Sequence, residues 1–410
     1  MKRLIIILFI LLSLTGMSIF AQSEDMAFYT EEFNRPGSTF FSRLEVLETV
    51  RNANLTGIGE FYHEALRTLI GVLPNANTWD ERAAAAASAR ILVQGLAAET
   101  YLPAASDIWV LIQNFDVVHA INDGIVMHDA LIALGQIDSR DHIPYIVRRL
   151  DSFNRDHTND VATRLRFQRG VAGAIIALET LQDPSGFAPV FFTSIGWFDS
   201  AIRNMAANAL PNIVEDPADI IIALIRDASN NPAVKYEAWR GMLRTNAPDS
   251  SKARVAAAAL DVGWGFLTAN LEFQRQLREM RLSAIDTIRV MGVADSSVYA
   301  NLQRSYRNNF TAIAPDYDEI HRTLAALSAS GSDEAVDLLF GFLHELHHRR
   351  QFGPWGMRER QVLQMLIPAL GASRTQSVQA IALLSAIQRS GDYTHVEQGW
   401  ARNALAALGF

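Results

Sequence analysis

The chain has no cysteine among its 410 residues. Disulfide bridges, thiolate zinc sites, iron–sulfur ligation and cysteine nucleophiles are therefore all excluded. Lysine is almost as rare, because only Lys2, Lys235 and Lys252 contribute to the 36 basic residues. Stability must come from packing, and nearly every cationic side chain is an arginine.

The chain also has fewer basic than acidic residues, because 44 acidic residues against 36 basic ones give a net charge of -8. An acidic balance provides no general attraction to the phosphates of nucleic acid, so we expect no nucleic-acid partner. The composition, 49% hydrophobic and 20% charged, is that of a folded protein with a large core.

Long apolar runs are missing except at the start of the chain. There, Lys2 and Arg3 precede the apolar run Leu4–Leu14, and small residues lead to Ala21. This pattern is typical of a secretory signal. We predict a signal peptide at residues 1–21 and export to the periplasm of a two-membrane bacterium. An uncleaved membrane anchor is the alternative, although the run is short for a membrane span. No span is expected after signal cleavage.

Strand signals are weak throughout the remainder. Alternation of polar and apolar residues is scarce, while alanine runs such as Ala83–Ala87 and Ala256–Ala259 favour closely packed helices. Residues 22–40 contain four acids and the pair Pro36-Gly37, and we expect them to form an extended N-terminal arm. Residues 41–410 are predicted to form a single all-α domain.

A repeated pattern runs through this domain. Five segments each contain an alanine- and leucine-rich helix, a short turn with an aspartate, and a second apolar helix: Asp129–Leu150, Val171–Ile195, Met205–Ile225, Leu282–Leu302 and Tyr317–Leu343. The last apolar anchors predicted for the first helices are Leu134, Leu178, Leu210, Leu243, Val290, Leu327 and Leu370. Their irregular spacing fits stacked helical hairpins better than the constant repeat of a tetratricopeptide array.

An aspartate follows most of these anchors within a few residues. The set is Asp138, Asp183, Asp216, Asp295 and Asp333, and Ser373 takes the place of the aspartate after Leu370. A side chain at this position can accept hydrogen bonds from the free N–H groups of the next helix. We therefore interpret these residues as helix caps rather than catalytic acids.

The segments resemble HEAT repeats, including the HEAT-like units of phycobilisome lyases, over about Arg82 to Phe410. The clearest match is Ala130–Leu150, with Ala133–Gly135, the turn Asp138–Asp141, and Arg148-Arg149. The resemblance implies an α-solenoid of stacked antiparallel helical hairpins. Family members are mostly protein-binding scaffolds whose second helices line a concave surface, and a minority carry lyase or DNA-repair chemistry.

This resemblance leads us to expect a non-enzymatic scaffold that needs no cofactor and binds a protein partner of unknown identity. The candidate partner-binding residues are Arg148, Arg149, His344, His348 and Arg349. The tryptophans Trp197, Trp239, Trp264, Trp355 and Trp400 are interpreted as fillers within or between repeats. A component of the cell envelope that assembles with itself, as a homo-oligomer, is a further possibility.

One motif points to a different function. His344, Glu345 and His348 match H-E-x-x-H, in which two histidines on one helix face bind zinc and the glutamate activates water. A catalytic zinc needs a third protein ligand, yet Gln351 and Pro354 stand where a metzincin has glycine and histidine. Basic side chains are also favoured at a helix C-terminus. A zinc-dependent hydrolase is therefore the alternative to the scaffold.

Overall fold

The structure is a computed structural model that describes residues 26–118, 124–373 and 375–410. Every regular element in these ranges is a helix, and none is a strand. The prediction of an all-α fold is therefore confirmed. The predicted signal peptide at residues 1–21 lies outside the described residues.

The chain forms two compact units, which divide between Val214 and Glu215. Unit 1 precedes this division and unit 2 follows it. The expectation of one continuous domain over residues 41–410 stays a prediction.

Unit 1 begins with a helical segment at residues 26–34, within the region expected to form an extended arm over residues 22–40. Phe33 is fully buried, and its carbonyl accepts a hydrogen bond of 3.2 Å from the Arg43 guanidinium. The turn at Pro36-Gly37 follows, with Gly37 at φ +86°. Phe33 thus packs this segment against the rest of unit 1. The expectation of an extended arm is corrected for residues 26–34, which are helical.

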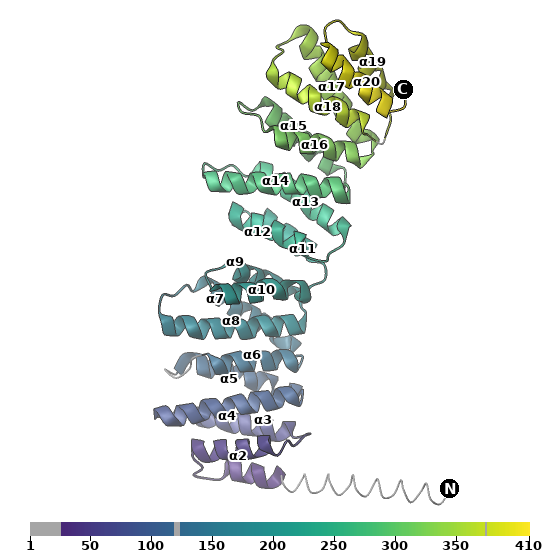
Figure 1. Ribbon diagram of the computed structural model, residues 1–410. Coiled ribbons are helices and arrows are strands. Elements are labelled where there is room, and N and C mark those ends of the chain that lie inside the picture. Colours follow the sequence, from purple (N-terminus) through teal and green to yellow (C-terminus); the bar gives the residue numbers. More distant parts are fainter. Residues whose placement is uncertain (1–25, 119–123, 374) are drawn as a thin grey trace, which may run out of the picture. The chain divides into compact units, whose positions relative to one another are not determined.

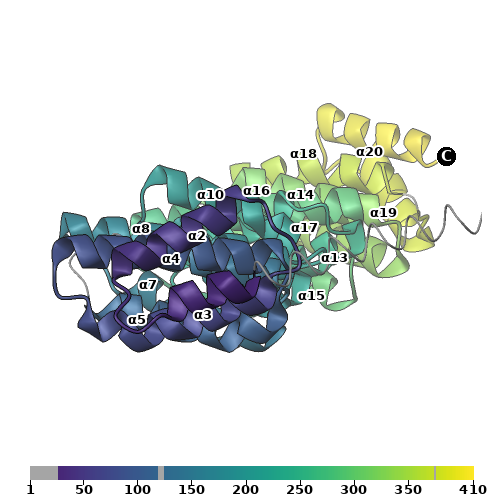
Figure 2. The same cartoon turned by 90° about the horizontal axis from the view of Figure 1, so that it is seen from below.

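The remaining helices of unit 1 form two layers (Figure 1, Figure 2). The first-helix layer contains α2 (Phe40–Asn52), α4 (Trp79–Ala98), α6 (Ile125–Gln136), α8 (Val161–Leu181) and α10 (Ser200–Ile213). Each of these helices packs on the next one in the layer. The second-helix layer contains α3 (Gly59–Val72), α5 (Ala105–Val118), α7 (Ile143–Arg155) and α9 (Phe187–Ile195).

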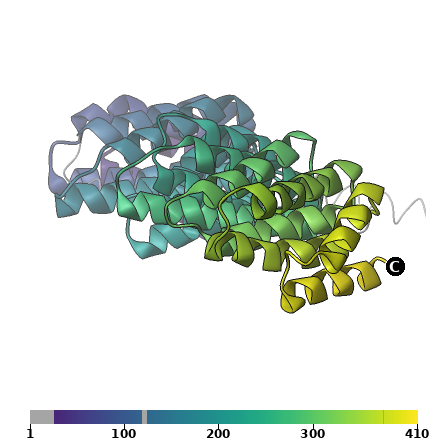
Figure 3. The same cartoon turned by 90° about the horizontal axis from the view of Figure 1, so that it is seen from above.

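Unit 2 repeats the same arrangement, and Figure 3 shows its last helices nearest the viewer. Its first-helix layer contains α12 (Pro232–Leu243), α14 (Leu271–Met291), α16 (Tyr317–Ser330), α18 (Met357–Gly371) and α20 (His395–Ala407). Its second-helix layer contains α11 (Ala218–Arg226), α13 (Asp249–Gly265), α15 (Ser297–Thr311), α17 (Asp333–Phe352) and α19 (Val378–Arg389).

Within each unit, the packing is continuous rather than divided into separate hairpins. The helix α7 packs more closely on α8 than on α6, and α15 packs more closely on α16 than on α14. A second helix therefore buries its apolar side largely against the first helix that follows it. The predicted helix–turn–helix segments exist, but inside each unit the second helix of a segment packs mainly on the first helix of the next one.

Two glycines set the contact between α6 and α8. A Cβ added to Gly135 would lie 2.9 Å from the Ala177 Cα, and one added to Gly173 would lie 2.7 Å from the His128 carbonyl oxygen. Both distances are too short for any side chain. The two helix backbones therefore touch, each through a glycine of its own.

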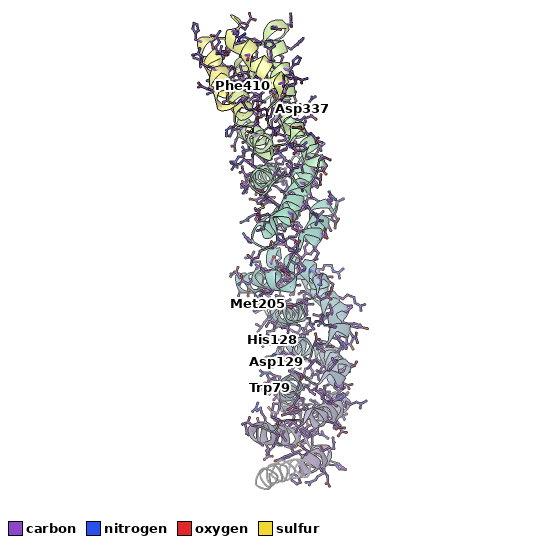
Figure 4. All side chains as sticks on the ribbon, turned by 90° about the vertical axis from the view of Figure 1, so that its right-hand side faces the viewer. Trp79, His128, Asp129, Met205, Asp337 and Phe410 are labelled. Carbon is purple, nitrogen blue, oxygen red and sulfur yellow. The ribbon has the colours of Figure 1, made fainter. Side chains whose placement is uncertain are left out.

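Side chains also join α4 to α6. The Asp129 carboxylate accepts hydrogen bonds from the Arg90 guanidinium at 2.8 Å and the His128 ring at 2.9 Å. Burial raises the pKa of Asp129, but these two hydrogen bonds outweigh it, so the net pKa lies below its usual value. Figure 4 shows His128 and Asp129 in one row with Trp79 and Met205, along the first-helix layer of unit 1.

Five of the seven predicted anchors are buried: Leu134, Leu178, Leu210, Leu327 and Leu370. The other two predictions are wrong, because Leu243 is 39% exposed and Val290 is 72% exposed. Their buried counterparts are Met242 and Ile288. Successive helix positions differ by about 100°, so an error of one or two residues moves an anchor to the solvent side.

Three of the five turn aspartates are caps. Asp183, Asp216 and Asp295 each accept a hydrogen bond from the backbone N–H two residues further on, at 2.9, 3.1 and 2.8 Å. These bonds supply an acceptor to N–H groups that have no helical partner.

The remaining turn residues act differently. Asp138 adopts the left-handed conformation with φ +53° and pairs with Arg140 at 3.1 Å, so it shapes the turn instead of capping it. Ser332, not Asp333, caps α17 by accepting from the Ala335 N–H at 3.1 Å. The Ser373 hydroxyl donates to the Leu370 carbonyl at the end of α18. The predictions for Asp138, Asp333 and Ser373 are corrected accordingly.

Candidate functional site

The five predicted contact residues fall into two groups. Arg148 and Arg149 lie in α7 of unit 1, whereas His344, His348 and Arg349 lie in α17 of unit 2. All five belong to second-helix layers. The structure therefore offers two candidate surfaces, each with its own neighbours.

The first surface is an aromatic cluster formed by Trp109 of α5, Tyr145 of α7 and His142 just before α7, here named the α5–α7 cluster. The Trp109 and Tyr145 ring centroids are 5.5 Å apart, and His142 lies 5.8 Å from Tyr145 and 6.4 Å from Trp109. The rings are mutually tilted by 40 to 45°. Tyr145 is 44% exposed, and Trp109 is half-buried.

Arg148 extends this cluster. It follows Tyr145 by nearly one helical turn, which places its guanidinium carbon 4.9 Å from the tyrosine ring centroid. Its Nε donates to the Pro144 carbonyl at 3.1 Å. The side chain is exposed, so its cation is held beside the rings and open to a partner.

Arg149 belongs to a different side of α7. Its guanidinium carbon lies 4.7 Å from the ring centroid of Phe153, which is buried. Adjacent helix positions differ by about 100°, so two consecutive arginines face different surroundings. Of the two predicted residues, the structure brings only Arg148 to the α5–α7 cluster.

His142 is the titratable member of the cluster. Burial lowers its pKa, and the charge of Asp141 opposes this effect only in part. Its Nδ1 forms a hydrogen bond of 2.8 Å with the Ser139 hydroxyl. Near pH 7 the neutral form of the ring is therefore favoured, which suits its position beside two aromatic rings.

Acidification from pH 7 to pH 5 is expected to destabilise unit 1. The folded pKa of His142 is lowered, so the unfolded chain binds the proton more readily, and stability is lost as pH falls below the unfolded value of about 6.5. Urea unfolding at several pH values measures this effect. The free energy of unfolding of the His142→Gln variant should fall less between pH 7 and pH 5 than that of the parent chain. An equal fall in both proteins would show that His142 is not the group responsible.

The second surface carries the H-E-x-x-H residues on α17. His344 and His348 are exposed, with ring centroids 5.8 Å from Phe340 and 5.3 Å from Phe352. Glu345 forms an ion pair with the Arg349 guanidinium at 3.0 Å. Within the described residues, no three histidine, aspartate or glutamate side chains are placed to hold one metal ion. The glutamate that would activate water is thus engaged by an arginine.

His347 and Arg350 were not among the predicted site residues. The His347 Nδ1 lies 2.9 Å from the Tyr393 hydroxyl, and Arg350 Nε donates to the Asp392 carbonyl at 2.8 Å. The Arg350 guanidinium also lies 4.6 Å from the Trp355 ring centroid. These contacts join α17 to the loop between α19 and α20, so both side chains serve the packing of unit 2.

A polar groove of about 570 Å³ crosses the second-helix layer of unit 2 between α11, α13 and α15. Its buried walls include Ala257 and Ala258, whose small side chains leave space between the helices. Charged side chains of both signs surround it, among them Asp219, Arg254 and Asp261. The groove therefore has no single charge preference.

Comparison of the chain with models of known protein families gives no match, and comparison with curated proteins gives none either. Among the helices of the described residues, none has the length and apolar character needed to cross a membrane. A functional assignment thus depends on the chain's own side chains.

Proposed function

We propose that the chain is an exported, non-enzymatic scaffold with HEAT-like α-solenoid architecture, which binds another protein through its second-helix layer. The recurring helix–turn–helix segments and the two layers in each unit support this architecture. The observation that carries the binding role is the α5–α7 cluster with Arg148 beside it.

The chemistry of the cluster is that of a protein-binding hot spot. Tryptophan, tyrosine and arginine are enriched where partners bury a small central patch. Trp109 and Tyr145 support each other in fixed positions, so little side-chain freedom is lost on binding. Arg148 adds a cation that can pair with a carboxylate or carbonyl of the partner.

Photo-crosslinking in living cells tests the proposal. A benzoylphenylalanine in place of Tyr145 is expected to capture one protein partner, and Arg148→Ala in the same chain should reduce that product strongly. The matched control is benzoylphenylalanine in place of Trp79, which is 68% exposed in the first-helix layer of the same unit. Equal products from both positions, or none from either, would count against the second-helix layer as the binding surface.

Export is a separate part of the proposal. It is supported by the charged start and the apolar run Leu4–Leu14. N-terminal sequencing of the chain isolated from the periplasm is expected to begin near Gln22. Recovery only from the cytoplasm would refute this part and leave the binding role in place.

The zinc hydrolase remains the alternative, and metal analysis separates it from the scaffold. After dialysis, the purified chain is expected to carry less than roughly a tenth of an equivalent of zinc, because no third ligand for His344 and His348 is found among the described residues. A full equivalent that disappears in the His348→Ala variant would favour the hydrolase. Light scattering at several concentrations tests the self-assembling alternative, for which the measured mass rises with concentration.

A further inference from the structure

A second groove, of about 440 Å³, lies in the first-helix layer of unit 2, between α14, α16 and α18. It is separate from the second-helix surfaces described above. Most of its walls are apolar, and they come from Leu324, Ala325 and Ala329 of α16 and from Met365, Pro368 and Ala369 of α18.

Small residues create the space. Ala325 and Ala329 are one helical turn apart and therefore share a face of α16. Ala369 lies on the opposite wall, in the last turns of α18. Larger side chains at these three positions would fill the gap between the helices, so the groove depends on alanine.

The groove also carries basic side chains beside its apolar walls. Among the described residues, the charged or titratable side chains that line the groove are Arg289 and His321, and none of the lining residues is acidic. Arg289 is 46% exposed and only 3.7 Å from Asp286, whose carboxylate is also bound by Arg322. Within the described chain, His321 forms no hydrogen bond or ion pair. The groove thus offers an exposed guanidinium that is only loosely paired with Asp286, and an imidazole that no other described residue binds.

Pro368 supplies a further recognition element. Proline has no N–H, so the carbonyl of Gln364 lacks its usual helical donor four residues on. Pro368 itself lines the groove. The proline ring therefore adds to the apolar wall at a point where α18 lacks one helical hydrogen bond.

We propose that this groove binds a short peptide segment of a partner protein in which a bulky apolar side chain stands next to a carboxylate. The apolar side chain occupies the space left by the alanines, and the carboxylate pairs with Arg289 and His321. Charge complementarity favours an acidic segment, because Arg289 and His321 are the charged or titratable groups among the described lining residues.

Fluorescence polarisation at pH 7 with a labelled decapeptide of leucine, aspartate and glycine tests the proposal. Wild-type protein is expected to bind this peptide at least roughly tenfold more tightly than the same peptide with lysine in place of aspartate. The Arg289→Gln and His321→Gln variants should each weaken binding severalfold, because both positions are exposed and the changes leave the helices intact. The Ala369→Leu variant should abolish binding by filling the groove.

Two controls keep this test separate from the partner role of the second-helix layer. The Arg226→Gln variant, at an exposed arginine of α11, and the Arg148→Ala variant should leave the peptide affinity unchanged. Equal binding of the acidic and basic peptides, no binding by wild type, or full binding by Ala369→Leu would each overturn the proposal. Displacement of the peptide by decanoate at matched concentration would overturn it in favour of a small anionic amphiphile.

Discussion

Replacing Arg281 by methionine is expected to lower the free energy of unfolding of unit 2 by about 3–5 kcal/mol. The guanidinium of Arg281 in α14 donates two hydrogen bonds of 3.0 Å to the carboxylate of Glu319 in α16. The Glu319 side chain has no exposed surface, and that of Arg281 is 12% exposed. The substitution would therefore leave a buried carboxylate without its cation.

The remaining contacts of this pair show why little else could compensate. The Ser305 hydroxyl of α15 donates to Glu319 at 2.8 Å, and a single neutral donor does not replace a guanidinium. Arg281 also donates to the Gly263 carbonyl at 3.1 Å and stacks 4.0 Å from the Trp264 ring centroid. The pair thus connects α13, α14, α15 and α16, and its loss affects both layers of unit 2.

Urea unfolding followed by circular dichroism measures the effect. The double variant Arg281→Met with Glu319→Gln should regain part of the loss, because the buried charge is removed together with its partner. The matched control is Arg275→Met, whose partner Glu272 lies on the surface of the same helix, and no measurable change is expected there. A loss below about 1 kcal/mol for Arg281→Met would show that water reaches Glu319.

Replacing Trp239 by alanine should lower the free energy of unfolding of unit 2 by about 3–5 kcal/mol. Trp239 of α12 has no exposed surface, and its Nε1 donates a hydrogen bond of 2.6 Å to the Ser283 hydroxyl of α14. Alanine would leave a large cavity between two first helices that pack on each other. It would also remove the donor that satisfies Ser283.

Replacing Trp239 by phenylalanine separates the contribution of packing from that of the hydrogen bond to Ser283. The Trp239→Phe variant keeps most of the packing but loses the hydrogen bond, so a loss of about 1–2 kcal/mol is expected. Trp79→Ala serves as the control, because Trp79 is 68% exposed and surface substitutions usually change stability by less than about 0.5 kcal/mol. Similar losses for Trp239→Ala and Trp79→Ala in thermal unfolding would refute the assignment of Trp239 to the core.

Periodicity and turn chemistry predict the elements of this chain well, because both are local properties. The expected helix–turn–helix segments are present, and the prediction that Trp239 is a filler between repeats is confirmed by its burial. Which residue of a helix faces the core is harder to predict from the sequence. Val290 was predicted to be buried but is exposed, and Ile288, two positions earlier, is buried instead. A wide apolar stripe contains several neighbouring candidates, and only packing against the next helix selects among them.

The candidate sites are harder to predict, because they join residues far apart in the sequence. Trp109 precedes Tyr145 by 36 positions, and only the packing of the second-helix layer brings the rings together. Arg148 and Arg149 look equivalent as neighbours, yet they contact different rings. The grooves are even less visible in the sequence, since they arise where alanines on several helices leave space.

The paired glycines of α6 and α8 also bear on how unit 1 deforms. Because the two backbones touch at these glycines, we expect α6 and α8 to resist sliding and tilting and to move together. We expect unit 1 to bend instead where α6 packs on α4 and where α8 packs on α10. These contacts are held by side-chain hydrogen bonds, such as Arg90 with Asp129 and Asn212 with Glu179. Under a pulling force, we expect the α4–α6 and α8–α10 contacts to separate first and the α6–α8 contact to separate last.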